Sequence, residues 1–211
     1  MRTLAPLSAT IRAASREQHT EAENSSFVVD LMKGKLSLSD YALYLANLAV
    51  VYEALEKQTA RGTAYAGSEP IWDAKLNRLP KIENDLVQLG HPHWRTELHA
   101  TDAAQEYARH ISSLNGRADI RLLAHHYTRY LGDLSGGQAI AALVARHYGA
   151  TEDQLSFYRF PDIESIVHYK ENYRKQLDAL PVTDADQDLL IAEVQRAFRE
   201  NQSIFDDLAR N

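Results

Sequence analysis

The sequence predicts an all-α protein, and three observations lead to this fold class. Apolar residues recur at the three- and four-residue spacing of amphipathic helices along most of the 211-residue chain. Alternation of apolar and polar residues over the length of a strand is missing. Glycine (9 residues) and proline (6 residues) are sparse, and almost all of them fall between the periodic segments, where they punctuate helices.

We expect nine helices, and several of their ends follow from particular residues. Four glycines should stop the helices before them, because glycine readily adopts the left-handed conformation that closes a helix. These are Gly34, Gly90, Gly116 and Gly149. Pro181 should break the eighth helix, and Thr183 with Asp186 three residues later has the capping pattern that starts the ninth. In chain order the expected helices cover residues 5–23, 26–33, 38–60, 70–89, 102–114, 117–147, 152–157, 162–179 and 184–208.

Length and hydropathy predict one domain that covers residues 1–211 and does not enter a membrane. A chain that is 45% hydrophobic can bury a sizeable core at this length. No apolar run approaches the roughly 18 residues that a membrane helix needs. The first residues lack the uninterrupted apolar core of a signal peptide, so we expect a cytoplasmic protein.

The composition also excludes several classes of function. The chain contains no cysteine, which rules out disulfides, thiolate nucleophiles, iron–sulfur clusters and cysteine-ligated metals. Nine histidines remain as candidates for metal chemistry. The net charge of −6 and the lack of a long basic run argue against a nucleic-acid partner, although a local basic patch could still bind an anionic small molecule.

The stretch YLGDLSGGQ, residues 130–138, places three glycines inside an otherwise helical segment. Each interior glycine costs about 1 kcal/mol relative to alanine. On a helix, Gly132, Gly136 and Ala139 share a face and leave a stripe with almost no side chains. This stripe is either a notch for a neighbouring helix or a surface on which a planar ligand lies. LSGGQ is also the signature peptide of ATP-binding-cassette ATPases, but the chain has no GxxxxGK[ST] phosphate loop to support that interpretation.

The segment IRAASREQHTEAEN near the N-terminus contains a candidate metal ligand. His19 has Glu23 one helical turn later and Arg12 two turns earlier, close to one face. A metal-binding imidazole usually has its second ring nitrogen oriented by a carboxylate or carbonyl, and Glu23 can supply this. An ordinary surface pair of histidine and glutamate is the alternative. Weaker candidates are His91, His93, His99, His125 and His126.

Taken together, these motifs resemble the heme oxygenase family, and most closely its bacterial members. The resemblance rests on RYLGDLSGGQ after HHY, on the His-x-x-x-Glu pair and on YKENYRKQL near residue 173, and it extends from Arg12 to about Leu208. It implies a fold in which heme is sandwiched between a proximal helix, which carries the iron ligand, and a kinked distal helix, whose glycines lie over the macrocycle.

The resemblance assigns the two faces of the heme. His19 is the proximal ligand, while Gly132 and Gly136 expose backbone to heme and dioxygen, with Gly137 helping the kink. The composition agrees with this ligand, because a chain without cysteine and with methionine only at positions 1 and 32 leaves histidine or tyrosine as the usual heme ligands.

Further site residues follow from the resemblance by position. Asp133 would anchor an ordered water beside the dioxygen, and Tyr52, Arg129 and Asn201 would hold the distal hydrogen-bond network. Ordinary polar packing between helices is the alternative for these last three. The heme propionates would contact Arg12, Tyr127, Lys170 and Arg174, and Phe198 would pack against the macrocycle or within the core.

One position departs from the bacterial pattern. Ser165 stands where those relatives have a further lysine, so one propionate contact is missing or is supplied by His168.

The activity implied by the resemblance is oxidative cleavage of heme, which is both cofactor and substrate, to biliverdin, carbon monoxide and ferrous iron, with dioxygen as co-substrate. Attack at the α-meso carbon is expected. Electrons must come from outside, from a ferredoxin or a flavoprotein reductase, because the sequence shows no flavin or nicotinamide fold. The alternative is a heme carrier or sensor without turnover. A thiaminase-like enzyme of the same helical fold is excluded, since it would need a cysteine nucleophile.

Overall fold

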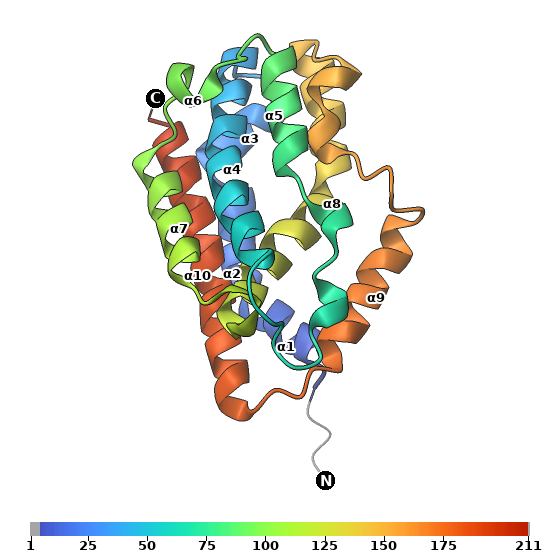
Figure 1. Ribbon diagram of the computed structural model, residues 1–211. Helices are drawn as coiled ribbons and strands as arrows, with labels where there is room; N and C mark the ends of the chain where they lie inside the picture. The colour runs from blue at the N-terminus through green and yellow to red at the C-terminus, as the bar shows by residue number, and fades with distance from the viewer. Residues whose placement is uncertain (1–4, 211) are drawn as a thin grey trace.

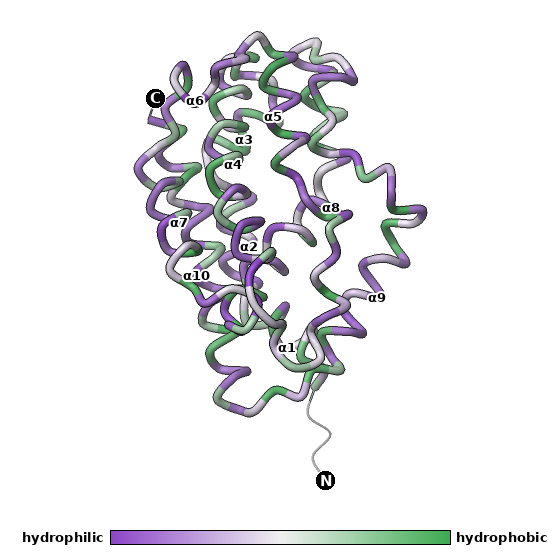
Figure 2. The backbone as a smooth tube through the Cα atoms, viewed as in Figure 1, coloured by the Kyte–Doolittle hydropathy of each residue, from purple (hydrophilic) through white to green (hydrophobic). Residues whose placement is uncertain are grey.

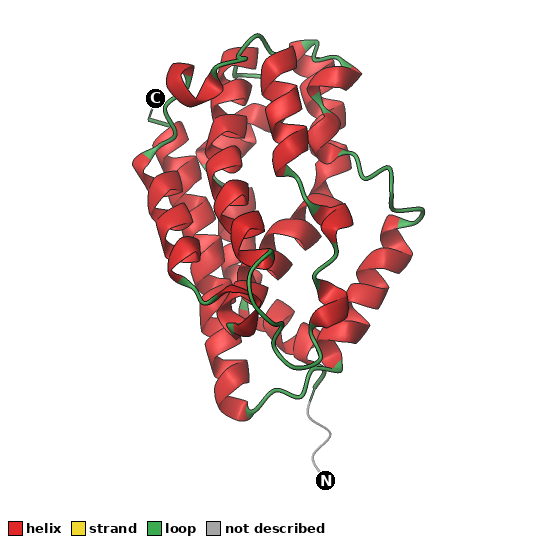
Figure 3. Ribbon diagram, viewed as in Figure 1, coloured by secondary structure: helices red, strands yellow, loops and turns green. Residues whose placement is uncertain are grey.

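Helices account for all the regular secondary structure within residues 5–210, which the computed structural model describes (Figure 3). Residues 1–4 and 211, the ends of the expected domain, lie outside the described residues. The α-helices are α1 (Leu7–Ala14), α2 (Arg16–Glu23), α3 (Ser26–Met32), α4 (Leu38–Thr59), α5 (Leu79–Gln88), α6 (Trp94–Glu97), α7 (Asp102–Ser113), α8 (Ile120–Tyr148), α9 (Ile166–Asp178) and α10 (Asp184–Leu208). The short 3-10 helices are η1 (Glu69–Ile71), η2 (Ala74–Leu76), η3 (Gly116–Ala118), η4 (Glu152–Gln154) and η5 (Ser156–Tyr158).

The long helices pack around α4 and α10. In Figure 1, α4 lies beside α7, and α10 runs along α7 and contacts α8 behind it. The short helices α1, α2 and α3 all contact α10, while α9 stands at the edge of the molecule and contacts α1 and α8. Hydrophobic and hydrophilic residues are interspersed along each of these helices (Figure 2), as expected of amphipathic helices. The elements that carry the expected site, α2 and α8, are therefore held by a common neighbour, α10.

One cluster of buried apolar side chains fills the space between the helices. It contains residues of every long helix, with fully buried tyrosines among its largest members, including Tyr41, Tyr52 and Tyr107. Burial on this scale is the main favourable contribution to folding, at about 25 cal/mol per Å² of apolar surface. Within residues 5–210, no helix combines the length and the apolar character needed to cross a bilayer.

The helix α8 runs through all three glycines. It extends over 29 residues, is capped at its start by the side chain of Asp119 and ends at Gly149, whose φ of +70° closes it. Its ribbon changes direction along its course (Figure 1). The prediction of a helix instead of a loop across residues 130–138 is thus confirmed.

Several expected helix ends are confirmed, and one glycine behaves differently. The Thr183 and Asp186 capping box opens α10 as expected. Gly34 and Gly90 follow α3 and α5 with positive φ. Gly116 also has positive φ, but α7 has already ended at Ser113, and Gly116 opens the 3-10 turn η3. Its backbone packs so closely on Arg61 that a Cβ would lie 2.7 Å from the Arg61 carbonyl oxygen.

Four expected helices differ in extent from those of the structure. The helix over 5–23 is divided at Ser15, where the hydroxyl hydrogen-bonds the Ile11 carbonyl at 2.9 Å, a contact that bends helices. The helix over 70–89 is shorter and begins at Leu79. Pro80 belongs to the first turn of α5, because its ring would clash with the preceding turn if the helix ran through from residue 70. The regions 152–157 and 162–179 also differ: the first forms η4 and the start of η5, and α9 begins at Ile166.

Candidate functional site

The three glycines of α8 do not share one environment. A Cβ added to Gly132 or Gly136 would meet no atom of the described residues within 4 Å outside its own helix. A Cβ at Gly137 would lie 3.0 Å from Cδ1 of Tyr158, and Gly137 is buried. The two interpretations left open by the sequence therefore apply to different glycines. Gly132 and Gly136 form an open strip of main chain, whereas Gly137, which was expected to help the kink, packs against Tyr158.

His19 lies on α2 with its imidazole half exposed. Its Nδ1 is 3.3 Å from the Glu23 carboxylate, and its ring meets Phe198 edge to face at a centroid distance of 5.6 Å. With 55% and 67% of their side chains exposed, His19 and Glu23 form a contact that contributes little to stability. Within the described residues the other ring nitrogen, Nε2, makes no hydrogen bond. An imidazole held at one nitrogen and free at the other is arranged as a metal ligand requires.

The helix α10 connects His19 to the glycine strip. Phe198 contacts the His19 ring, and Asn201, three residues later and on the same face, accepts a hydrogen bond from Nη1 of Arg129. Arg129 precedes Gly132 by three residues on α8. The imidazole of His19 and the Arg129 side chain, one helical turn before the open strip, therefore contact the same stretch of α10.

The expected distal residues form one hydrogen-bonded network drawn from three helices. Tyr52 on α4 donates its hydroxyl to the Asp133 carboxylate. Arg129 donates to the Tyr52 oxygen at 3.3 Å and to Asn201, and its guanidinium lies 5.0 Å from the Tyr52 ring centre. Tyr52, Arg129 and Asn201 are buried, and Asp133 is half-buried. The structure thus brings together all four residues that were expected to act on the distal side.

The carboxyl group of Asp133 ionises close to neutral pH. Burial raises its pKa to about 6, against the opposing effects of the Arg129 charge, the Tyr52 hydroxyl and the Arg78 charge. Burial alone would lower the pKa of Arg129, but the nearby Tyr52 and Asp133 raise it, so the guanidinium stays charged. A carboxyl poised near neutrality beside a fixed cation is suited to holding and releasing a proton.

Two contacts of this site were not expected from the sequence. Tyr44 lies near both Arg129 and Asp133, and burial raises its pKa to about 12. Its position two turns before Tyr52 on α4 is the signal that could have found it. Ser135 receives a hydrogen bond of 3.2 Å from Nζ of Lys170, which ties α9 to the glycine segment. No spacing rule relates residues 135 and 170.

The expected cations gather beside the same helix. Burial raises the pKa of the Tyr127 hydroxyl, and the charges of Arg174 and Arg12 both act against this rise, so both guanidinium groups lie within electrostatic reach of Tyr127. Arg12 lies in the last turn of α1 and Arg174 lies on α9. The helices α1 and α9 contact each other. Together with Lys170, they place three cations around one side of α8.

Ser165, which stands where the bacterial pattern has a lysine, caps a helix in this chain. It is the N-cap of α9, and its hydroxyl accepts a hydrogen bond of 3.3 Å from the His168 amide. The side chain of His168 is exposed at the start of the same helix.

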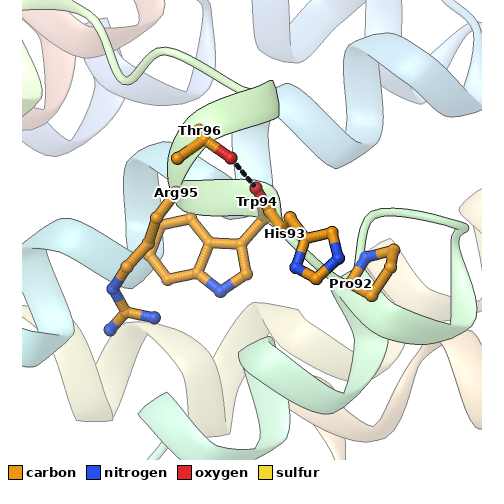
Figure 4. A pocket seen from close by; sticks show the side chains of 5 residues that line it. All are labelled: Pro92, His93, Trp94, Arg95 and Thr96. Atoms are coloured by element: carbon orange, nitrogen blue, oxygen red, sulfur yellow. Dashed lines mark hydrogen bonds between the residues drawn. The ribbon is translucent and has the colours of Figure 1, made fainter.

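His91, His93 and His99 of the loop region belong to no group of three metal-ligating side chains among the described residues. A pocket at α6 is lined by five consecutive residues, Pro92 to Thr96, and Figure 4 shows Arg95 reaching along the Trp94 indole. The Arg95 guanidinium lies 4.2 Å from that ring, and Thr96 hydrogen-bonds the His93 carbonyl at 3.0 Å. His91 pairs with Glu97 at 3.2 Å. Within residues 5–210, no group of three metal-ligating side chains includes a histidine of this loop.

Comparison with known proteins gives the same assignment along nearly the whole chain. Residues 5–207 match the family model described as heme oxygenase. The chain is 32% identical to heme oxygenase 1 of Synechocystis sp. over 205 residues, covering 97% of this chain and 85% of that protein. Human heme oxygenase 1 is 33% identical over 205 residues, with 96% and 71% covered.

Solved structures agree with this comparison. The crystal structure of Synechocystis heme oxygenase-1 in complex with heme has a TM-score of 0.89 at 31% identity and covers 98% of this chain and 94% of that one. The heme oxygenase of Leptospira interrogans has a TM-score of 0.88 at 35% identity, with 95% and 98% covered. These relatives are named as oxygenases, which does not favour the alternative of a carrier or sensor. The chain belongs to the heme oxygenase family.

Proposed function

We propose that this protein is a heme-degrading monooxygenase that cleaves heme to biliverdin, carbon monoxide and ferrous iron, with dioxygen as co-substrate and electrons from a separate protein. The observation that carries the proposal is the arrangement around α10. There Phe198 contacts the imidazole of His19, and Asn201 accepts a hydrogen bond from Arg129. Arg129 also donates to the Tyr52 oxygen, and Tyr52 in turn holds the half-buried carboxyl of Asp133, which lies next to the open strip of main chain.

The residues present fit heme in three respects. The free nitrogen of His19 suits the iron of a heme, which takes imidazole readily. The open strip at Gly132 and Gly136 leaves room for a flat macrocycle to approach main chain. Arg12, Lys170 and Arg174 offer the positive charge that two propionates require, although the protein as a whole is acidic. When bound, heme supplies the iron chemistry that activates dioxygen and is also the substrate that is oxidised.

On the proximal side the protein holds the ligand nitrogen in position. The Glu23 carboxylate, 3.3 Å from Nδ1 of His19, favours a proton on that nitrogen and so leaves the Nε2 lone pair free. Contact with the Phe198 ring restricts the orientation of the imidazole and presents an apolar surface for the macrocycle.

On the distal side the protein limits space and supplies protons. The main chain at Gly132 and Gly136 forms a close wall that restricts where dioxygen fits. Asp133, which accepts a hydrogen bond from Tyr52, anchors a water molecule that delivers protons there, and Arg129 holds the Tyr52 oxygen in turn. Because its pKa is about 6, the carboxyl is mostly ionised at pH 7 and can accept the hydrogen bond of this water.

The electron donor, a ferredoxin or a flavoprotein reductase, would dock near the exposed heme edge beside the cations of α1 and α9. An electrostatic dock weakens as ionic strength rises, so turnover at limiting donor concentration should fall with added salt. We also propose that residues 1–211 form one domain, which the single apolar cluster supports. A cytoplasmic location remains a prediction of the sequence.

The test is a single-turnover experiment on the hemin complex of the purified protein. After reduction and exposure to air, the complex should lose its Soret band and yield biliverdin and carbon monoxide. A stable spectrum of the oxygenated complex, with no biliverdin formed, would support the carrier or sensor instead. Absence of a Soret shift on mixing with hemin would contradict both.

A further inference from the structure

A second group of metal-ligating side chains lies where α7, α8 and α10 meet, outside the site described above. It consists of His110 on α7, His125 on α8 and Glu193 on α10, whose ligand atoms all lie within 4.8 Å of one another. The Nε2 of His125 is 2.8 Å from Oε1 of Glu193, and the Nε2 of His110 contacts the same oxygen. Within residues 5–210 it is the one group of three histidine or acidic side chains close enough to hold a metal ion.

The group is distinct from the heme site. His125 precedes Gly132 by two helical turns of α8. Glu193 precedes Phe198 by five residues, so Glu193 and Phe198 lie on different faces of α10. The proposed heme chemistry does not use any of the three residues.

The three side chains offer the atoms that a cation needs. A carboxylate and a neutral imidazole are the forms that bind metal ions. When Nε2 of His110 ligates a metal, the ring carries its proton on Nδ1.

Tyr107 holds His125 from the other side. Its hydroxyl lies 3.1 Å from Nδ1 of His125. Without a metal, Nε2–H of His125 donates to Glu193, and Nδ1 accepts from the hydroxyl. With a metal on Nε2, the ring proton moves to Nδ1 and donates to the Tyr107 oxygen, because a hydroxyl can both donate and accept. The proton stays on the imidazole, and Tyr107 is the outer partner that orients a ligating histidine.

We propose that His110, His125 and Glu193 bind a divalent first-row transition-metal cation such as Zn²⁺. Two imidazoles and one carboxylate are a ligand set that such ions favour, whereas Mg²⁺ and Ca²⁺ prefer oxygen ligands. The ion would enter from the His110 side, because His125 is fully buried while 12% of the His110 side chain and 10% of the Glu193 side chain are exposed. The nearby cation that acts on His125, Arg196, is paired with Glu200 at 3.1 Å.

The test is a Co²⁺ titration of the heme-free protein after removal of metals with a chelator. The ligand-field absorption of bound Co²⁺ should saturate at one equivalent, be displaced by Zn²⁺ and be unaffected by excess Mg²⁺. His110→Ala should abolish this absorption, and Tyr107→Phe should weaken binding about 10- to 100-fold. His99→Ala, which removes an exposed histidine elsewhere, is the matched control and should leave the titration unchanged. His19→Ala should retain the site, which separates it from the heme ligand.

Circular dichroism of each variant checks that it has folded. If His110→Ala does not fold, the wild-type protein and Tyr107→Phe still test the site. At equal Zn²⁺ concentration, the melting temperature should rise more in the wild-type protein than in Tyr107→Phe. A wild-type protein that binds neither ion would show that the three side chains form a hydrogen-bonded packing group only. Binding that survives His110→Ala, or that is lost in His19→Ala, would also overturn the proposal.

Discussion

Tyr52 donates a hydrogen bond to Asp133, so that the central helix α4 holds the carboxylate of the glycine-containing helix α8 from across the core. Arg129 donates to the same tyrosine oxygen and to Asn201 of α10, which joins three helices through one polar network. Buried polar groups that are satisfied in this way fix a particular arrangement of the helices that carry them. The consequences can be measured as pH dependence, stability and heme affinity.

Heme degradation should depend on the ionisation of Asp133. Its pKa of about 6 lies above the ordinary value of 3.8, so the carboxyl becomes protonated as pH falls through 6. If the carboxylate anchors the proton-delivering water, the rate of biliverdin formation should fall with an apparent pKa near 6, a dependence that Asp133→Asn should not show. An identical pH profile in both proteins would remove Asp133 from this role.

The raised pKa of Asp133 also makes a prediction about stability. A carboxyl that binds its proton more tightly in the folded state destabilises that state as pH rises from the unfolded pKa to the folded one. Replacing Asp133 by Asn removes this penalty while keeping an acceptor for Tyr52. The free energy of unfolding in urea should therefore be about 2–3 kcal/mol higher for Asp133→Asn at pH 7, and the gap should close near pH 4. A gap that widens at acidic pH would contradict the sign of the shift.

Tyr52→Phe should raise the pKa of Asp133 further, because the hydroxyl hydrogen bond lowers that pKa in the native protein. The pH at which activity is half-maximal should move upward, and Arg129 loses one of its acceptors. Tyr41→Phe is the comparison, because Tyr41 is a buried tyrosine of the same helix that makes no hydrogen bond to Asp133 or Arg129, and it should leave the pH profile unchanged.

The glycines of α8 should separate heme binding from folding. Gly136→Ala adds a methyl group where nothing lies within 4 Å and gains about 1 kcal/mol of helix propensity, so it should stabilise the heme-free protein and weaken hemin binding. In Gly137→Ala the same gain is opposed by Cδ1 of Tyr158 at 3.0 Å, in a packed interior that yields little. The melting temperature of Gly136→Ala should therefore be higher than that of Gly137→Ala. The reverse order would mean that the open strip has been placed on the wrong glycines.

Arg174→Ala should weaken hemin binding without changing the pH profile of turnover. Arg174 lies within electrostatic reach of Tyr127 beside α8 but takes no part in the Asp133 network. Loss of one partly exposed propionate contact should reduce the affinity for hemin by about 10-fold, measured by titration of the Soret band. Lys175→Ala, one residue along on the same helix and exposed, is the matched control.

The sequence predicted the fold class and most of the extent of α8, because helical periodicity is a local signal. The resemblance, and not periodicity, named the four distal residues that the structure joins in one network. Prediction from the sequence failed where a distant contact decides the outcome. Gly137 has the same local context as Gly136, and only the position of Tyr158, 21 residues further on, gives it a different role. His110 and Glu193 are 83 residues apart, so no spacing rule could place them together with His125.

The boundary errors have a different cause. Ser15 lies in a segment with good helical periodicity, and the bend there comes from a side-chain hydrogen bond that periodicity does not detect. Pro80 was visible in the sequence and marks the true start of α5, since proline is tolerated only in the first turn of a helix.

Resonance Raman spectroscopy of the ferrous heme complexes of the wild-type protein and of His19→Ala decides whether Nε2 of His19 ligates the iron of heme. We expect an iron–imidazole stretching band in the wild type that is absent from His19→Ala and returns when free imidazole is added. An unchanged band in His19→Ala without imidazole would contradict this expectation.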